Sequence, residues 1–323
     1  MSEKDNQTRQ QIIAAIKSIS DDNESGAAEI LGRAAGVFSL AADRQTSMNS
    51  SGPESARAVI VEICARLALA QPDMAPLANL ASEVNSTVSR IAEGAEVRDV
   101  FELAAEAARS FTQSALRSAR FAASHAASLI ADGVTVLTHS RSSTVIAALL
   151  EARGAGKNFT VIATESRPAL EGRNLAEAVA REGARVILVA DAAAALLMEQ
   201  VDFVLMGADR VTPEFLINKI GTRMIALAAR EQGVPVYALC DTSKFTSASS
   251  LPDSEGESRS ADELWAGAPE GVLVLNRYFE PTPLGYFTGI ITENGALDPD
   301  HASRSARAKP SSESPPGPLR ESE

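Results

Sequence analysis

The sequence predicts an α/β protein in which an N-terminal helical domain precedes a parallel, doubly wound sheet. In the first third of the 323 residues, apolar side chains recur at helical spacing. From Gly133 onward, short β-branched runs alternate with Ala-rich, helix-compatible segments, a pattern typical of a parallel sheet with helices on both faces. Residues 301–323 are rich in Ser, Pro and charge, and are predicted to be disordered. The expected divisions are therefore residues 1–130, 131–300 and 301–323.

The helices of the first domain follow from the apolar pattern. Four isoleucines between residues 12 and 19 share one helical face, and the polar cluster Ser20–Ser25 ends that helix. Ala27–Leu40 and Arg57–Leu69 are the next two expected helices. Residues 95–132 contain neither Gly nor Pro, so they predict one long helix or two in succession.

The second domain is expected to alternate strands with helices. The predicted strands are Val134–Leu137, Phe159–Ala163, Arg185–Ala190, Phe203–Met206, Val234–Leu239 and Val272–Leu275. The predicted helices are Ser143–Ala152, Leu175–Glu182 and Arg223–Gln232. The Ser-rich stretch Ser243–Ser260 is expected to be an exposed loop. No GxGxxG follows the first strand, so the ordinary dinucleotide fingerprint is missing.

Composition limits the partners and the cellular setting. The net charge of −12 argues against direct nucleic-acid binding and against anionic membranes, so an anionic ligand needs local cations. The two cysteines, Cys64 and Cys240, belong to no metal-ligand pattern and indicate a reducing compartment. No apolar run is long enough to span a bilayer, and the first residues do not resemble a secretory signal. We therefore expect a soluble, cytoplasmic protein with no metal and no cofactor.

The stretch Gly207–Thr222 is the strongest candidate for a ligand site. It follows a buried strand with Asp209, and it enters the next helix through Asn218, Lys219 and Gly221. Ligands bind at the carboxyl ends of strands in open α/β sheets, and a helix start offers N–H groups to a phosphate. The alternative is a buried Asp209 that only caps the following turn.

Two other strand ends supply polar groups. After the first strand come His139, Ser140, Arg141, Ser142 and Ser143, whose hydroxyls and amides could cradle a phosphate. Ser142 could instead be a helix N-cap, and His139 either an acid or base or a buried structural imidazole.

The second strand is followed by Arg167 and Arg173, which together are suited to bidentate recognition of an anion. Glu165 and Arg167 could equally pair with each other on the surface. No Gly-x-Ser-x-Gly elbow and no Ser–His–Asp order accompanies these residues.

These motifs occur together in one known family. The shared motifs, in order, are Thr138-His139-Ser140, Thr164-Glu165-Ser166-Arg167-Pro168 with Glu171-Gly172-Arg173, Gly207-Ala208-Asp209, Ile217–Thr222, Ser243-Lys244-Phe245, Phe279–Pro283 and Ile290–Gly295. The chain resembles the family of translation initiation factor 2B regulatory subunits, which also contains ribose-1,5-bisphosphate isomerase and methylthioribose-1-phosphate isomerase. The resemblance covers about residues 20–297. It implies a C-terminal Rossmann-like domain through which the chain self-associates.

The resemblance also implies a chemistry. In the isomerases of this family, a cysteine and an aspartate move a proton between the first two carbons of a ring-opened sugar phosphate. The aspartate position matches Asp209, while the cysteine position is occupied by Ser140. An unactivated serine is a much poorer base or nucleophile than a thiolate.

The chain departs from the family at three further motifs, the first of which contacts phosphate in the isomerases. An Arg-Gly-Ala box reads Ser25-Gly26-Ala27, an Arg-Pro reads Gln71-Pro72, and Pro213–Phe215 replaces the usual Asn-Gly of the loop after Asp209. Each change removes charge or a characteristic group from the pocket. Thr-His-Ser matches the regulatory subunits better, whereas Asp209 is the isomerase-type residue.

Three hypotheses follow. The first is a regulatory, non-isomerase protein that binds a phosphorylated sugar or nucleotide and acts through a protein partner. The second is an aldose–ketose isomerase in which Asp209 is the acid or base and Ser140, His139 or Cys240 replaces the thiolate, although a packed, inert Cys240 is the simpler expectation. The third, ranked last, is a homo-oligomer whose pocket holds no ligand.

Overall fold

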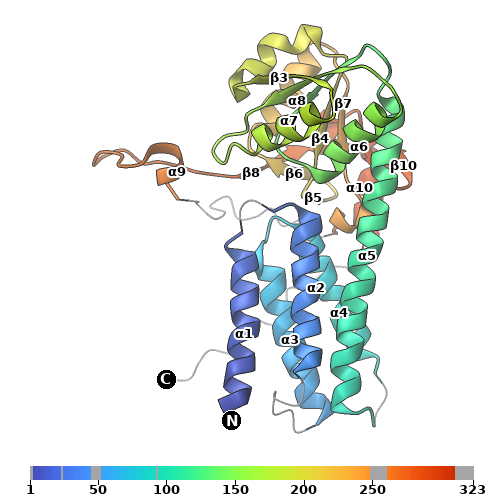
Figure 1. Cartoon of the computed structure of the whole chain (residues 1–323), viewed down its shortest axis with the longest axis vertical. Helices are drawn as coiled ribbons and strands as arrows, with labels where there is room; N and C mark the ends of the chain where they lie inside the picture. Colours follow the sequence, from blue (N-terminus) through green and yellow to red (C-terminus); the bar gives the residue numbers. More distant parts are fainter. Residues whose placement is uncertain (1–2, 23–24, 45–51, 92–93, 248–259, 310–323) are drawn as a thin grey trace. The chain divides into compact units, whose positions relative to one another are not determined.

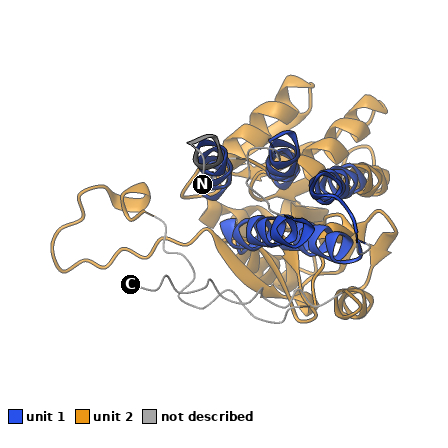
Figure 2. Cartoon of the chain, turned by 90° about the horizontal axis from the view of Figure 1, so that it is seen from below, with its two compact units in different colours: residues 1–22, 27–114, 310–323 blue, residues 23–26, 115–309 orange. Residues whose placement is uncertain are grey.

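A computed structural model describes residues 3–22, 25–44, 52–91, 94–247 and 260–309 (Figure 1). By its internal contacts the chain divides into two compact units, drawn in blue and orange in Figure 2. The helical unit contains Ala27–Ser114 and the preceding residues up to Asp22, and the α/β unit contains Ala115–Lys309 together with Gly26. The division falls inside one continuous helix, between Ser114 and Ala115.

The helical unit is built from α1 (Glu3–Ser20), α2 (Ala27–Asp43), α3 (Pro53–Ala70), α4 (Ala75–Ser89) and the first part of α5 (Val97–Leu129). Ile12, Ile16 and Ile19 are buried as the apolar stripe of α1 predicts, whereas Ile13 is exposed. Of the two alternatives for residues 95–132, the structure has the single long helix, α5, of 33 residues.

The α/β unit contains a seven-stranded sheet in the order β10-β9-β7-β4-β1-β2-β3. Its strands are β1 (Thr135–Thr138), β2 (Thr160–Thr164), β3 (Arg185–Val189), β4 (Phe203–Gly207), β7 (Val236–Leu239), β9 (Gly289–Thr292) and β10 (Gly295–Leu297). All neighbouring strands are parallel except β9 and β10. The predicted α/β, mostly parallel and doubly wound sheet is confirmed.

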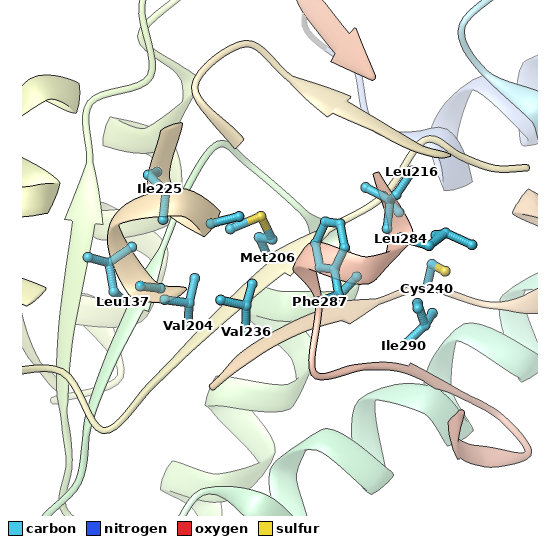
Figure 3. Packing of buried hydrophobic residues seen from close by; sticks show 14 of the residues in the cluster. Leu137, Val204, Met206, Leu216, Ile225, Val236, Cys240, Leu284, Phe287 and Ile290 are labelled. Atoms are coloured by element: carbon cyan, nitrogen blue, oxygen red, sulfur yellow. The ribbon is translucent and has the colours of Figure 1, made fainter. Parts of the chain in front are cut away.

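Alternating residues of the strands fill two cores, one on each face of the sheet. Val136 and Leu205 pack with α6 (Ser143–Gly154), α7 (Glu171–Arg181) and the end of α5. Leu137 and Val204 pack on the opposite face with η2 (Asp191–Gln200), α8 (Thr222–Glu231) and α10 (Pro299–Arg307), as Figure 3 shows in part. Because both faces are covered, the central strands read as continuous apolar runs.

A small antiparallel sheet lies beside the main one. It consists of β5 (Arg210–Val211), β6 (Phe215–Lys219) and β8 (Phe279–Pro283), in the order β5-β6-β8. The segment after Asp209 is therefore a hairpin and not only a loop. This hairpin returns the chain to Lys219, beside the strand end from which it left.

Three expectations about segments are wrong. Val272–Leu275 forms no strand within the described residues 260–309, and its side chains are largely exposed. The expected loop Ser243–Ser260 begins with η3 (Thr242–Lys244), and Lys244, Phe245 and Thr246 are buried, while residues 248–259 lie outside the described residues.

The third correction concerns the predicted tail. Helix α10 occupies Pro299–Arg307, with Asp298 as its N-cap and Ala302 and Ala306 buried. The remainder of the predicted tail, 310–323, lies outside the described residues. In the described part of the chain, no helix is both long and apolar enough to cross a membrane.

Candidate functional site

The candidate site lies where the strand order of the main sheet reverses. From β1 the chain proceeds through β2 to β3 on one side, and β4 pairs with β1 on the other side. Loops that leave neighbouring parallel strands in opposite directions open a crevice at their carboxyl ends, which is where such sheets bind ligands. The ends of β1, β2 and β4 carry the predicted candidates Ser140, Arg167 and Asp209.

Ser140, Glu171 and Lys219 form the centre of the site. The Ser140 hydroxyl donates to Glu171 Oε1 at 3.0 Å, and Lys219 Nζ lies 2.7 Å from the same oxygen. Lys219 is almost fully buried, and its ammonium also lies 4.2 Å from the centre of the Tyr278 ring. In this structure Lys219 is paired with a carboxylate, so a phosphate that bound to Lys219 would share it with Glu171 or displace Glu171.

The backbone at Ser140 has a left-handed conformation, with φ of 67°. Its N–H donates to Ser166 Oγ at 2.8 Å, and Ser166 has φ of 64°. Non-glycine residues with positive φ are uncommon, and surrounding bonds must hold them there. The β1–α6 loop is therefore held in a conformation that keeps the Ser140 hydroxyl on Glu171.

Asp209 follows β4 and faces a second lysine. Lys244 Nζ lies 3.9 Å from Asp209 Oδ1, and it also donates to the Ala208 carbonyl. Desolvation by burial raises the pKa of Asp209; Lys244 and Lys219 oppose the rise, while Glu171 adds to it. The predicted candidate Asp209 is thus a carboxyl group whose neutral form is favoured, inside a field made by two ammonium groups and a second carboxylate.

Ser142 and Asn218 lie beside Gly207, at the end of β4. An added Cβ at Gly207 would lie 2.8 Å from Ser142 Cβ and 4.0 Å from Asn218 Oδ1, so the β1–α6 loop packs directly on the end of β4. Ser142 Oγ accepts from Val145 N at 3.3 Å, which makes it the N-cap of α6. Asn218 is buried and donates to Thr222 Oγ1 at 2.9 Å.

His139 is a structural imidazole and not a free acid or base. Its Nε2 lies 2.8 Å from the Ile220 carbonyl, which can only accept, so Nε2 carries a hydrogen; Nδ1 lies 2.6 Å from Thr164 Oγ1. Burial lowers the pKa of His139, against the opposing effect of the Ile220 carbonyl. The ring joins β1, β2 and the start of α8, and an added Cβ at Gly221 would lie 3.0 Å from Nε2.

The start of α8 is not open to phosphate, contrary to the expectation for Gly221-Thr222. The Glu280 carboxylate, from β8, accepts from Gly221 N at 2.8 Å and from Arg223 N at 2.9 Å. A carboxylate at a helix N-terminus satisfies the same N–H groups that a phosphate would use. An anion at this position would have to displace Glu280.

The two predicted anion-binding arginines are both exposed and do not share a partner. Arg173 Nη2 pairs with Glu165 Oε2 at 2.7 Å, and Arg167 Nη2 donates to the Glu263 carbonyl at 3.4 Å. The alternative pairing of Glu165 with Arg167 is therefore wrong. The loop itself is fixed by Asp191, whose two oxygens accept from Ser166 N and Arg167 N at 2.7 Å each.

Helix α7 approaches the end of β2 very closely. An added Cβ at Gly172 would lie 1.9 Å from the Thr164 carbonyl oxygen, so only glycine fits at the second position of α7. This close approach carries Glu171 into contact with Ser140 and Lys219.

Arg141 and Ser143 lie next to the segment that replaces the family's Arg-Gly-Ala box. An added Cβ at Gly26 would lie 3.9 Å from Ser143 Oγ and 4.0 Å from Arg141 Nη1. The predicted phosphate-binding loop and the Ser25-Gly26 segment therefore form one surface. Arg141 brings a guanidinium group to the side where the family's arginine is replaced by Ser25.

Cys240 is a packed thiol. It is fully buried in the core of Figure 3, and burial raises its pKa, so the unreactive thiol form is favoured. Among the residues that the structure describes, no three His, Cys, Asp or Glu side chains are grouped so as to hold a metal ion.

Sequence reasoning did not select Glu171, Lys244 or Glu280 as site residues. All three belong to the motifs that carry the family resemblance, but the sequence did not show which side chains they contact. Their roles depend on where α7, η3 and β8 place them relative to β4, β6 and the start of α8, which only the fold determines. With Glu171 and Lys244 added to Asp209, Lys219 and Ser140, the centre of the site combines two carboxylic acids, two lysines and a hydroxyl, a set able to donate and accept protons.

Comparison with known proteins agrees with this fold. The model of the Initiation factor 2 subunit family matches residues 23–299. A putative translation initiation factor eIF-2B subunit 2-like protein of Pyrococcus furiosus is 31% identical over 90% of this chain and 97% of its own length. The crystal structure of a Pyrococcus horikoshii translation initiation factor eIF-2B has a TM-score of 0.75 and 27% identity, over 93% of this chain and 98% of that one.

Other relatives are named as isomerases. A ribose 1,5-bisphosphate isomerase of Archaeoglobus fulgidus is 41% identical over 54% of this chain. A putative methylthioribose-1-phosphate isomerase of Methanothermobacter thermautotrophicus is 39% identical, also over 54%. The chain spans 56% and 61% of the lengths of these two relatives. On the match over residues 23–299, this chain belongs to the Initiation factor 2 subunit family.

Proposed function

We propose that the protein is an aldose–ketose isomerase that acts on a ribose-1-phosphate-type sugar phosphate. The observation that carries the proposal is Asp209, a carboxyl group at the end of β4 whose pKa is raised mainly by burial and which faces Lys244. Relatives named for ribose 1,5-bisphosphate and methylthioribose-1-phosphate isomerisation support the substrate class. They favour this function over the regulatory one that we ranked first from the sequence.

The reaction requires an acid and a base, and both are available. When the sugar ring opens, the bond between C1 and the ring oxygen breaks and that oxygen gains a proton. The hydrogen on C2 moves to the electron-poor C1 as a hydride, with the electron pair of the C2–H bond, and the C2 hydroxyl loses its proton as the C2–O bond becomes a carbonyl. A carboxyl group whose pKa is raised by burial is better suited to carry and deliver a proton than an ordinary carboxylate, and protonation of the ring oxygen is the role proposed for Asp209.

The phosphate is proposed to bind at the β1–α6 loop. Arg141, Ser143 and the backbone near Gly26 lie on one surface there. The N-terminus of α6 adds a favourable dipole, although Ser142 already caps one of its N–H groups. The N–H groups at the start of α8 are covered by Glu280, so the β1–α6 loop is the helix start preferred here for the phosphate.

Asp209→Asn tests the proposal. The amide keeps the shape of the side chain but cannot deliver the proton, so we expect kcat to fall about 100-fold to 10,000-fold. Conversion of ribose 1,5-bisphosphate and methylthioribose 1-phosphate to the ketose would be followed by NMR. Asp300→Asn, an exposed change on α10, is the matched control and should leave the rate unchanged. Full activity of Asp209→Asn would reject the assignment.

A regulatory binder is the second candidate function. The observations that favour it are Ser140 at the family's cysteine position and the pairing of Lys219 with Glu171, which lowers the positive charge of the pocket. The eIF-2B-like relative that is matched over 97% of its length supports it too. In this case a sugar phosphate or nucleotide would stabilise the protein without being converted, and a protein partner would respond to the bound state.

Self-association through the C-terminal domain is proposed for either function. The segment 260–275, which contains α9 (Asp262–Trp265), exposes several large apolar side chains. They are Leu264, Trp265, Val272, Leu273 and Leu275. Several large apolar side chains exposed on one short segment are a candidate interaction surface, because large exposed apolar patches often mark one.

A further inference from the structure

We infer that Glu171 is the base that drives isomerisation, acting through the hydroxyl of Ser140, and that this pair replaces the family's cysteine. The inference rests on the proposed isomerase function and deepens it. Its physical basis is the contact between Ser140 Oγ and Glu171 Oε1 at 3.0 Å. A serine whose hydroxyl donates to a carboxylate is no longer the unactivated serine that the sequence alone presents.

The position of Glu171 is fixed from two sides. Its Oε1 also lies 2.7 Å from Lys219 Nζ, and Lys219 is held in turn against the Tyr278 ring. Behind it, α7 is pressed onto β2 because Gly172 meets the Thr164 carbonyl. The carboxylate is therefore preorganised, as a base that acts through a second group must be.

The second oxygen of Glu171, Oε2, is able to accept a hydrogen bond or a proton. Glu171 Oε2 is buried and has no hydrogen-bond partner within the described part of the chain. An ion pair that served stability alone would be expected to satisfy both oxygens, since a buried polar atom without a partner costs free energy. This second oxygen could accept a proton without the loss of an existing hydrogen bond.

Glu171 and Asp209 then have different roles: one accepts a proton and the other donates one. Ser140 Oγ takes the proton that the C2 hydroxyl of the substrate loses, while its own hydroxyl proton passes to Glu171. Asp209 supplies the proton that the ring oxygen gains. The proton on Glu171 returns to Asp209 through solvent, which resets the enzyme. Aldose and ketose have the same overall oxidation level, so no oxidant or reductant takes part.

In this scheme Ser140 is the catalytic residue, and Glu171 is a positioning residue and proton acceptor behind it. Glu171→Gln should lower kcat about 100-fold to 10,000-fold with little change in KM, the range typical of a lost general base. The acidic limb of the pH–rate profile should disappear, because that limb reports protonation of the base. Glu171→Asp keeps a carboxylate and should recover part of the rate and the limb.

A double-mutant cycle separates the relay from a structural role. If Glu171 acts through Ser140, then Glu171→Gln should cost nothing further in a Ser140→Ala background. Glu177→Gln is the matched control, since it is the same change on the same helix in an exposed pair with Arg181. It should leave kcat, KM and the pH profile unchanged.

The outcomes are distinguishable. Additive losses in the cycle, or a Glu171→Gln enzyme with the wild-type pH profile, would overturn the relay while leaving Asp209 and the isomerase function intact. If wild-type protein converts no pentose 1-phosphate, the proposed function fails and the relay fails with it. Should Glu171→Gln not fold because Lys219 loses its partner, Ser140→Ala keeps that ion pair, and an unchanged rate and pH profile in this variant would also overturn the relay.

Discussion

Asp209, the proposed acid of the site, lies in surroundings that oppose stability. The largest effect on its pKa is desolvation, which favours the neutral acid, and the two nearby lysines offset only part of this effect. A carboxyl group whose pKa is higher in the folded than in the unfolded protein binds more protons when folded. Stability therefore falls as pH rises from the ordinary pKa of 3.8 through the folded value, and it stays lowered above that value.

Asp209→Asn should accordingly remove this dependence on pH. We expect the variant to be at least as stable as wild type at neutral pH, and to lose less stability than wild type between acidic and neutral pH. Urea unfolding at several pH values measures the difference. Asp300→Asn should follow the wild-type curve, and an Asp209→Asn variant that is less stable at neutral pH would show that the attraction of Lys244 exceeds the desolvation cost.

Two glycines, Gly172 and Gly221, are required by neighbours that are distant in the sequence. Gly172 in the Glu-Gly-Arg motif is required because any side chain would collide with the Thr164 carbonyl, and Gly221 has φ of 104° and lies against His139. The sequence showed that both glycines stand beside candidate residues. The neighbours that make them necessary come from other strands, so they were not predictable from local sequence.

At the scale of elements, α8 and β8 depend on each other. Glu280 on β8 caps the first turn of α8 through Gly221 N and Arg223 N. No local residue serves as a side-chain cap, and Gly221 at the N-cap position has none to offer. The helix therefore begins correctly only when β8 is paired with β6.

Glu280→Ala should lower the free energy of unfolding by about 1 kcal/mol, the usual value of a helix cap. Glu280→Gln keeps an acceptor oxygen and should retain most of the stability. Thermal or denaturant unfolding measures the change. Inorganic phosphate should stabilise Glu280→Ala more than wild type, because the N–H groups become available to an anion; equal stabilisation of both would contradict the assigned cap.

Two of the three failed segment predictions, the strand Val272–Leu275 and the disordered tail, failed for different reasons. Val272–Leu275 has strand-like composition, but within residues 260–309 it pairs with no strand edge, and composition cannot supply a partner. Helix α10 was overlooked because of its charge and Ser content. Asp298 followed by Pro299 is nevertheless a good local signal for a helix start, and the small buried surface of Ala302 and Ala306 suffices once β9 and β10 are beside it.

At the scale of the whole molecule, the exposed apolar segment 260–275 bears on assembly. It appears in Figure 2 at the end of an extended part of the orange unit. Glu263 in this segment accepts from the Tyr278 hydroxyl at 2.8 Å, and the Tyr278 ring covers Lys219. Burial of the segment against a second copy would therefore also affect the surroundings of the candidate site.

Leu273→Glu should weaken self-association. Leu273 is 83% exposed, so the change leaves the folded monomer undisturbed but puts a charge into the proposed interface. We expect the dissociation constant to rise at least tenfold, which corresponds to about 1.4 kcal/mol. Light scattering after size-exclusion chromatography measures it. Leu196→Glu, at an equally exposed 80% position on η2, is the control; the same shift in both variants, or a monomeric wild type, would contradict the proposal.

The sequence by itself determined the fold class, five of the seven strands of the main sheet, most of the α-helices, and the strand ends at which the candidate site lies; β9, β10 and the small sheet β5-β6-β8 were not predicted. The elements follow from apolar periodicity, which is a local property of the sequence. The location of the site follows from the geometry of parallel sheets, which is the same in every such sheet. It also pointed to Asp209, Ser140, Asn218 and Lys219. What only the tertiary structure decided is which charges meet: Lys219 with Glu171, Asp209 with Lys244, and Glu280 with the start of α8. These contacts join residues 25 or more positions apart, and the free energy of a charge depends on its partner and its burial, neither of which is written in the local sequence.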